Sequence, residues 1–145
     1  MDKFEIIVTI LNILLLSAAA AFDIKKTEVP LTISFLLLIL NAVYSVTAII
    51  KGESPLSLLI TLALLLVLTI PFAVKGGLGG ADVLIEFGLA LTLRFRILYL
   101  ILFANLFCLP QSVKAQKTGK EYPFVPYILG SYILTLILGE LWHLP

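Results

Sequence analysis

Charged residues are scarce in this chain. They make up 13% of its 145 residues, whereas apolar residues account for 61% and mean hydropathy is +1.13. In ordinary soluble domains about a quarter of the residues are charged. Such a composition indicates an all-α membrane protein, because helices satisfy their backbone hydrogen bonds internally when water is excluded. We predict a single domain, residues 1–145, built as a polytopic bundle of about six transmembrane helices.

Cysteine and histidine are nearly absent. The chain has one of each, Cys108 and His143. One cysteine excludes an intrachain disulfide and any structural zinc site that needs several thiolates. We interpret Cys108 as a small apolar residue within a helix. No metal and no cofactor is expected.

A charge excess is also lacking. Ten basic residues stand against nine acidic ones, for a net charge of +1. This balance gives no electrostatic basis for binding nucleic acid. The partners expected from composition are membrane lipid and other membrane proteins, and a homo-oligomer stays open.

The apolar runs define the expected helices. A bilayer core of roughly 30 Å requires about 20 apolar helical residues. Three runs meet this requirement, and Pro30 and Pro55 stand where helices can begin. After the third run, two short spans or one long span are compatible with the sequence, because Arg94 and Arg96 interrupt it. The expected runs are Ile6 to Phe22, Leu31 to Ile50, Leu56 to Val74, Val83 to Leu93, Ile97 to Leu109 and Phe124 to Leu138.

The distribution of basic residues favours six spans over five. Short cytoplasmic loops are enriched in lysine and arginine. With six spans, one side of the membrane carries both Asp23 and Asp82 together with Lys25, Lys26, Lys75, Lys114, Lys117 and Lys120. The other side carries Lys3, Lys51, Arg94 and Arg96. Five spans would move the last three lysines to that other side. We therefore predict a plasma-membrane protein with both aspartates facing the cytoplasm.

Asp82 is the acid whose position most needs an explanation. It directly follows a glycine-rich stretch and precedes an apolar run. An ionisable side chain at membrane depth is costly, so it indicates a functional site. The stretch supplies Gly76, Gly77, Gly79, Gly80 and Ala81. Glycine permits positive φ and close backbone approach, which suits a loop that admits an extended peptide.

Asp23 has a comparable position, just past the expected C-terminal end of the first helix. Two close carboxyls that share a proton can hydrolyse a peptide bond, one as general base and the other as general acid. The positive end of a helix dipole favours an ionised Asp82, and the negative end of the first helix favours a protonated Asp23. Lys25 and Lys26 oppose the second half of this assignment.

Three segments of the chain resemble the type IV prepilin and preflagellin peptidase family of intramembrane aspartyl proteases. Gly79-Gly-Ala-Asp82 resembles the archaeal form of the family's Gly-x-Gly-Asp motif. Phe22-Asp23-Ile-Lys-Lys-Thr-Glu-Val-Pro30 is similar to its first catalytic block. Tyr122-Pro-Phe-Val-Pro-Tyr-Ile-Leu-Gly130 resembles the segment that opens its last helix. The three segments occur in the family's order.

This resemblance implies an enzyme that removes short basic leader peptides from prepilin-like precursors, such as pilins or archaellins, with Asp23 and Asp82 catalytic. The expected partner is a precursor with a basic leader before a hydrophobic helix. Three positions depart from the family pattern: Ala81 replaces a glycine, Leu84 a lysine and Leu31 an asparagine or aspartate. The cysteine-rich N-methylating domain of bacterial relatives is not expected.

Other polar residues are candidates for lesser roles. Glu86 lies one helical turn after Asp82, where it can tune the pair or bind a basic leader. Glu28, Lys25 and Lys26 are further candidates for substrate binding or tuning. Three asparagines within the apolar runs are expected to form hydrogen bonds between helices: Asn12, Asn41 and Asn105.

A transporter is the alternative class of protein. Intramembrane carboxylates often relay protons or bind cations, and Asp23 and Asp82 can be interpreted in that way. The position of both acids at helix ends on one side favours the protease, since a relay usually places acids deeper. The sequence leaves the identity of the precursor and the oligomeric state open.

Overall fold

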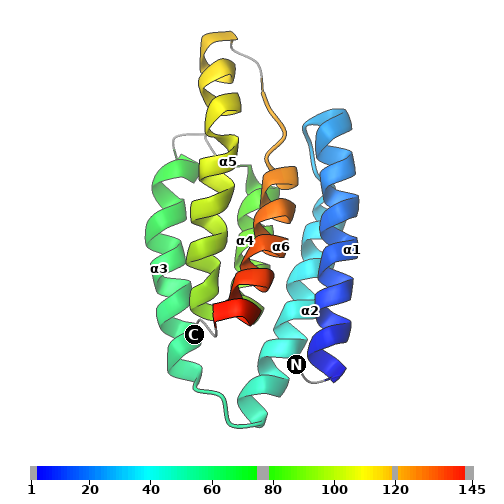
Figure 1. Ribbon diagram of the computed structural model, residues 1–145, viewed down its shortest axis with the longest axis vertical. Helices are drawn as coiled ribbons and strands as arrows, with labels where there is room; N and C mark the ends of the chain where they lie inside the picture. The colour runs from blue at the N-terminus through cyan, green and yellow to red at the C-terminus, as the bar shows by residue number, and fades with distance from the viewer. Residues whose placement is uncertain (1–2, 75–78, 119–120, 143–145) are drawn as a thin grey trace.

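The computed structural model describes residues 3–74, 79–118 and 121–142, and all regular structure in these ranges is helical. The chain runs up and down through a bundle whose helices lie roughly along one axis (Figure 1). The all-helical prediction is therefore confirmed. Helix boundaries are α1 Lys3–Lys26, α2 Leu31–Ile50, α3 Pro55–Val74, α4 Gly80–Leu93, a 3₁₀ turn η1 Arg94–Arg96, α5 Ile97–Thr118 and α6 Val125–Trp142.

Three helical stretches of the described chain are long and apolar enough to cross a membrane. They are Lys3–Lys26, Leu31–Ile50 and Gly80–Ala115, and shorter apolar helices cover Pro55–Pro71 and Val125–Gly139. Large apolar side chains on the outer surface, such as Leu14, Ile39 and Val67, are exposed, as lipid contact requires. The number of six spans stays a prediction.

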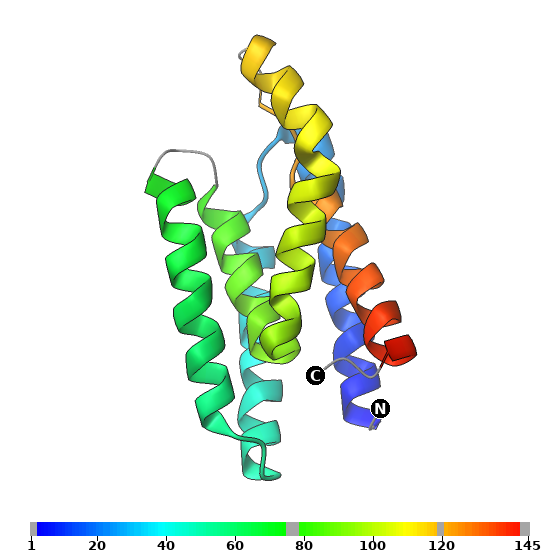
Figure 2. The same ribbon diagram turned by 60° about the vertical axis from the view of Figure 1, so that its left-hand side comes forward.

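The long third stretch is folded back on itself at η1. Arg94 has a positive φ of 53°, and α4 and α5 run in opposite directions on either side of the turn (Figure 2). The structure therefore has two antiparallel helices here, not one continuous helix. Arg94 also forms an ion pair with Glu53 at 3.3 Å, which joins η1 to the turn between α2 and α3.

One predicted boundary is wrong. The polar segment from Gln111, which we expected to be a loop, continues α5 as far as Thr118. Good helix formers such as alanine, glutamine and lysine follow Pro110, so the helix extends beyond the apolar bundle. In Figure 1 this end of α5 projects past the neighbouring helices.

Buried asparagines join helices at the centre of the bundle. The side chains of Asn12 on α1 and Asn41 on α2 donate to each other at 2.9 and 2.8 Å. Asn12 also donates to the Tyr132 hydroxyl on α6, and Thr92 on α4 donates to Asn41. The prediction of interhelical hydrogen bonds is confirmed for these two residues. It is wrong for Asn105, which is exposed and donates within its own helix to the carbonyl of Ile101.

The most extensive helix contact is between α2 and α4. Gly88 makes it possible, because a Cβ atom there would lie 2.7 Å from Leu37 Cδ2 and 3.2 Å from the Cα of Leu38. The absence of a side chain at residue 88 therefore sets how closely α4 approaches α2. Since α4 begins just ahead of Asp82, this contact also fixes the position of that residue.

Candidate active site

Asp23 lies in the last turn of α1, three residues before its end at Lys26. Its side chain is 5% exposed. The sequence had placed it just past the helix, but α1 continues to Lys26. The helix ends there because Thr27 has a positive φ of 51°, and its N–H donates to the carbonyl oxygen of Asp23 at 2.8 Å. The backbone at Asp23 is thus held by the turn that follows it.

Asp82 is the third residue of α4, after the N-cap residue Gly79. Its carboxyl group accepts a hydrogen bond from the backbone N–H of Gly79. A side chain that reaches back to the N-cap amide is half of a capping box, and it stabilises the start of a helix. A Cβ atom on Gly79 would lie 3.3 Å from Asp82 Oδ2, so glycine gives the carboxyl the room to fold back.

The glycines ahead of Asp82 divide into two groups. Gly79 has an extended φ of −70°, and Gly80 is helical with open space around it. Close backbone approach is therefore observed at Gly79, whereas positive φ is not used there. Ala81 is partly buried in the first turn of α4. Gly76 and Gly77 lie outside the described residues.

The fold brings Asp23 and Asp82 together at one end of the bundle. The C-terminal end of α1 and the N-terminal end of α4 lie at the same end (Figures 1 and 2), and the two carboxyls are close enough to interact electrostatically. The two residues are far apart in the sequence but lie at the same end because α1 and α4 run in opposite directions. The two acids therefore lie at the same end of the bundle, and their roles stay a prediction.

A third segment, which the sequence did not assign to the site, reaches both aspartates. The backbone N–H of Val125, the first residue of α6, donates to Asp23 Oδ2 at 2.7 Å. Just ahead of it, the Tyr122 side chain interacts electrostatically with Asp82. The resemblance of residues 122–130 to a family block was the signal that could have identified these residues.

Tyr122 also joins the site to α5. Its hydroxyl group hydrogen-bonds the thiol of Cys108, which is buried within that helix. The expectation of a buried helical cysteine is therefore confirmed. Burial, followed by the neighbouring thiol and Asp82, raises the pKa of Tyr122 above its ordinary value. The phenol consequently remains a protonated donor throughout the neutral range.

Glu86 extends the acidic group by one helical turn. It is 2% exposed, and its Oε2 atom finds no hydrogen-bond partner in the described part of the chain. It interacts electrostatically with Asp82. Asp82 therefore interacts electrostatically with both Asp23 and Glu86.

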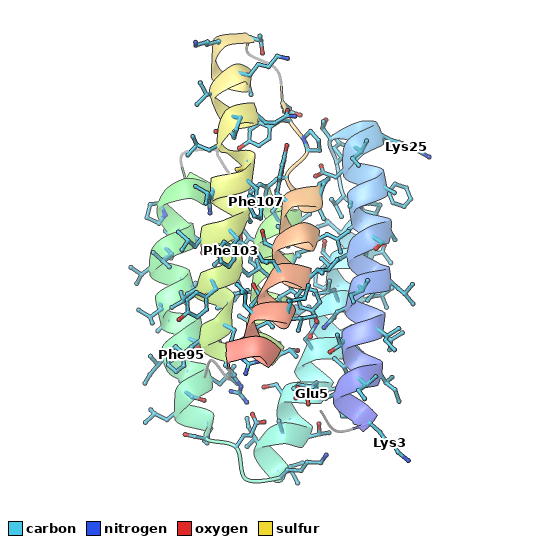
Figure 3. The ribbon with its side chains drawn as sticks, in the orientation of Figure 1. Lys3, Glu5, Lys25, Phe95, Phe103 and Phe107 are labelled. Carbon is cyan, nitrogen blue, oxygen red and sulfur yellow. The ribbon has the colours of Figure 1, made fainter. Side chains whose placement is uncertain are left out.

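The remaining candidates lie at the rim of this end. Lys25, Lys26 and Glu28 are exposed, and Figure 3 shows Lys25 extending away from the bundle, with Lys3 doing so at the opposite end. Glu121 is exposed as well, and it accepts a hydrogen bond from the Thr27 hydroxyl at 3.4 Å. Across the described ranges, no group of three or more His, Cys, Asp or Glu side chains is arranged to hold a metal ion.

Comparison with known families gives one match. The model of the type IV leader peptidase family matches residues 10–110. This range includes Asp23, Asp82 and Glu86, and it ends before the segment at Tyr122. No curated protein and no solved structure matches the chain significantly.

Proposed function

The chain belongs to the type IV leader peptidase family, and on that premise we propose that it is a membrane-embedded aspartic endopeptidase with Asp23 and Asp82 as its catalytic pair. The observation that carries the proposal is the convergence of the two carboxyls from α1 and α4 at one end of the bundle. The two carboxyls come from two different helices, and a backbone amide of a third helix donates to Asp23.

The chemistry needs only the two carboxyls and a water molecule. One carboxylate takes a proton from water, and the other carboxyl protonates the oxygen of the scissile carbonyl. Like charges at close range favour a state in which one acid is ionised and the other protonated. A pair that titrates in this way supplies both groups at once.

The family supports the proposed substrate class. We expect prepilin-like precursors whose basic leader precedes a hydrophobic helix. Glu28 and Glu121 are exposed acids at the rim, and their negative charges can attract a basic leader. The N-terminal part of the substrate helix must unwind beside the pair, since a helical peptide bond does not present its carbonyl freely.

The proposed location is the plasma membrane, with the site facing the cytoplasm. The end that holds the aspartates also holds Lys25, Lys26, Lys114 and Lys117, which agrees with the enrichment of basic residues on the cytoplasmic side. No observation supports the transporter alternative.

Cleavage of a prepilin-like substrate by the purified protein in detergent tests the proposal. Wild type should shorten the substrate at the junction between its basic leader and its hydrophobic segment. Asp23→Asn and Asp82→Asn should each lower kcat/KM by at least about 10²-fold, because each removes a general acid or base. Glu53→Gln, an acid at the opposite end, is the matched control and should retain activity. Normal cleavage by both aspartate variants would overturn the proposal.

A further inference from the structure

A cavity lies at the end of the bundle opposite the aspartates, between the start of α1 and the end of α2. Its volume is about 150 Å³, whereas a single buried water molecule needs about 10–15 Å³. Phe4 of α1 and Tyr44 of α2 both line it, and their rings stack with centroids 5.9 Å apart. The cavity therefore has room for a small polar group, and an aromatic contact joins the two helices that form its walls.

The cavity presents charges of both signs. Glu5, Lys51 and Glu53 line it, and Glu53 is paired with Arg94 at 3.3 Å. These four groups carry two negative and two positive charges, so net charge favours neither a simple anion nor a simple cation. A zwitterion, with one positive and one negative group, is the ligand that matches both signs at once.

Each of these side chains can bind more than one partner. An ionised carboxylate accepts about four hydrogen bonds, and an ammonium group donates three. Glu53 thus keeps acceptor capacity beside Arg94, and Glu5 and Lys51 keep capacity beside the contacts that they make within the protein. Glu5 lies in the first turn of α1, whereas Lys51 directly follows α2. Opposite charges therefore reach the cavity from different walls.

The cavity is at the level where the apolar part of these two helices ends. Both α1 and α2 are long and apolar enough to cross a membrane, and the cavity lies at the first turn of one and the last turn of the other. The adjoining turns toward the middle of the bundle expose the apolar side chains of Ile7 and Val43. A polar cavity that is continued by exposed apolar surface matches a lipid, whose headgroup is polar and whose chains are apolar.

We propose that this cavity binds the headgroup of a lipid that carries a primary ammonium and a phosphate. The ammonium donates hydrogen bonds to the carboxylates of Glu5 and Glu53, and the phosphate accepts hydrogen bonds from the ammonium group of Lys51. Charge-assisted hydrogen bonds of this kind are roughly twice as strong as neutral ones. A trimethylammonium group has no N–H to donate, so the site should select a primary amine.

This site is independent of the proposed peptidase activity, because it lies at the other end of the bundle and its occupancy is measured without cleavage. Thermal unfolding of the purified protein in a non-ionic detergent is the measurement. The probes are three dioleoyl lipids: phosphatidylethanolamine, which has a primary ammonium, phosphatidylcholine, which has a trimethylammonium, and phosphatidylglycerol, which has no ammonium.

Phosphatidylethanolamine at about ten times its dissociation constant should raise Tm by about 4 °C, because a ligand that binds only the folded state stabilises it. The other two lipids should raise Tm by less than half as much at the same concentration. No shift with phosphatidylethanolamine, or an equal shift with either of the other lipids, would overturn the proposal.

Two variants test whether the effect comes from this cavity. Lys51→Gln and Glu5→Gln each remove one charge from its lining, and each should weaken binding about tenfold, which reduces the lipid-induced shift to about a third. Lys3→Gln is the matched control, because Lys3 is exposed at the same end and extends away from the bundle (Figure 3). It should keep the full shift.

Each shift is measured against the same variant without lipid, so that a change in the variant's own stability does not enter. If a variant does not unfold cooperatively, native mass spectrometry measures the lipid that it binds. Undiminished binding by both Lys51→Gln and Glu5→Gln would overturn the proposal.

Glycerophosphoethanolamine, the same headgroup without chains, distinguishes a lipid from a soluble ligand. The lipid should bind more tightly, because its chains can cover the exposed apolar side chains of Ile7 and Val43. Equal shifts with the free compound would overturn the lipid as the source and support the same headgroup chemistry in a soluble ligand.

Discussion

Tyr122 shows how one side chain can connect parts of the site that are remote in sequence. Its hydroxyl group reaches the Cys108 thiol on α5, and its ring lies within electrostatic range of Asp82 on α4. Cys108 in turn donates to the carbonyl oxygen of Asn105 at 3.3 Å. The segment ahead of α6 is therefore held against both neighbouring helices at the end that carries the aspartates.

The raised pKa of Tyr122 predicts a pH dependence of stability. Because burial favours the neutral phenol in the folded protein, this stabilisation is complete below the ordinary pKa of 10.0 and is lost as pH rises through the higher folded value. Tyr122→Phe should therefore reduce the loss of stability seen above about pH 10. At neutral pH it should cost about 1 kcal/mol, since it removes one hydrogen bond.

Thermal unfolding of wild type and Tyr122→Phe at neutral and alkaline pH checks this prediction. Tyr99→Phe is a suitable control, because Tyr99 is exposed on the outer surface of α5. Equal alkaline losses of stability in wild type and Tyr122→Phe would contradict it.

At the scale of the elements, α4 is the helix whose position matters most for the site. It carries Asp82 and Glu86 and packs most extensively on α2. Its 14 residues correspond to about 21 Å, less than the roughly 30 Å of a bilayer core. A helix this short can begin below the membrane surface, which fits the proposed role of Asp82.

Gly88→Ala should disturb this helix. The added Cβ would lie 2.7 Å from Leu37 Cδ2 and 3.3 Å from the backbone nitrogen of Leu38. Because backbone atoms of α2 cannot yield as a flexible side chain can, we expect a loss of about 1 to 3 kcal/mol. A shift of α4 by a fraction of an ångström should also lower kcat/KM by roughly tenfold or more.

Gly130→Ala is the matched control for this prediction. Residue 130 is in α6, and no heavy atom lies within 4 Å of an added Cβ there. Alanine should stabilise the helix by about 0.5 to 1 kcal/mol and leave cleavage unchanged. Unfolding and cleavage are measured for both variants, and equal stability of the two would contradict the predicted overpacking at Gly88.

On the scale of the whole molecule, the turns that connect the antiparallel helices lie at one or the other of the two ends of the bundle. The turns at residues 27–30 and 121–124 lie at the end with the aspartates, whereas η1 and the turn between α2 and α3 lie at the opposite end (Figures 1 and 2). The ion pair of Glu53 with Arg94 closes that opposite end. The proposed site and the end that carries the Glu53–Arg94 ion pair are thus separated by the length of the bundle.

Labelling from the two faces of intact cells should report this separation. Cys108 is the only cysteine, so Cys108→Ala provides a background for Glu28→Cys, Glu121→Cys and Glu53→Cys. A membrane-impermeant thiol reagent applied outside should label only Glu53→Cys. Labelling of Glu28→Cys and Glu121→Cys should require permeabilised cells, because we propose that their end faces the cytoplasm. Labelling of Glu28→Cys and Glu53→Cys from the same side would contradict the topology.

Local pattern was sufficient for much of the fold. The length of the apolar runs located α2 without error, and proline at residues 30 and 55 marked the starts of α2 and α3. Such features depend on neighbouring residues, since helix formation and membrane insertion are decided over about 20 residues. Family blocks at Asp23 and Asp82 indicated both acids of the proposed pair for the same reason.

The environment of each acid could not be derived in this way, because it depends on contacts between distant segments. The Val125 amide that donates to Asp23 lies 102 residues from it in the chain, so no local pattern pairs the two. The sequence by itself indicated an all-helical protein of the leader peptidase family with apolar helices long enough to cross a membrane, and it singled out Asp23 and Asp82 as candidates. Tertiary structure alone decided that the first amide of α6 donates to Asp23 and that the C-terminal end of α1 and the N-terminal end of α4 lie together, since helix packing sets which groups a carboxyl meets.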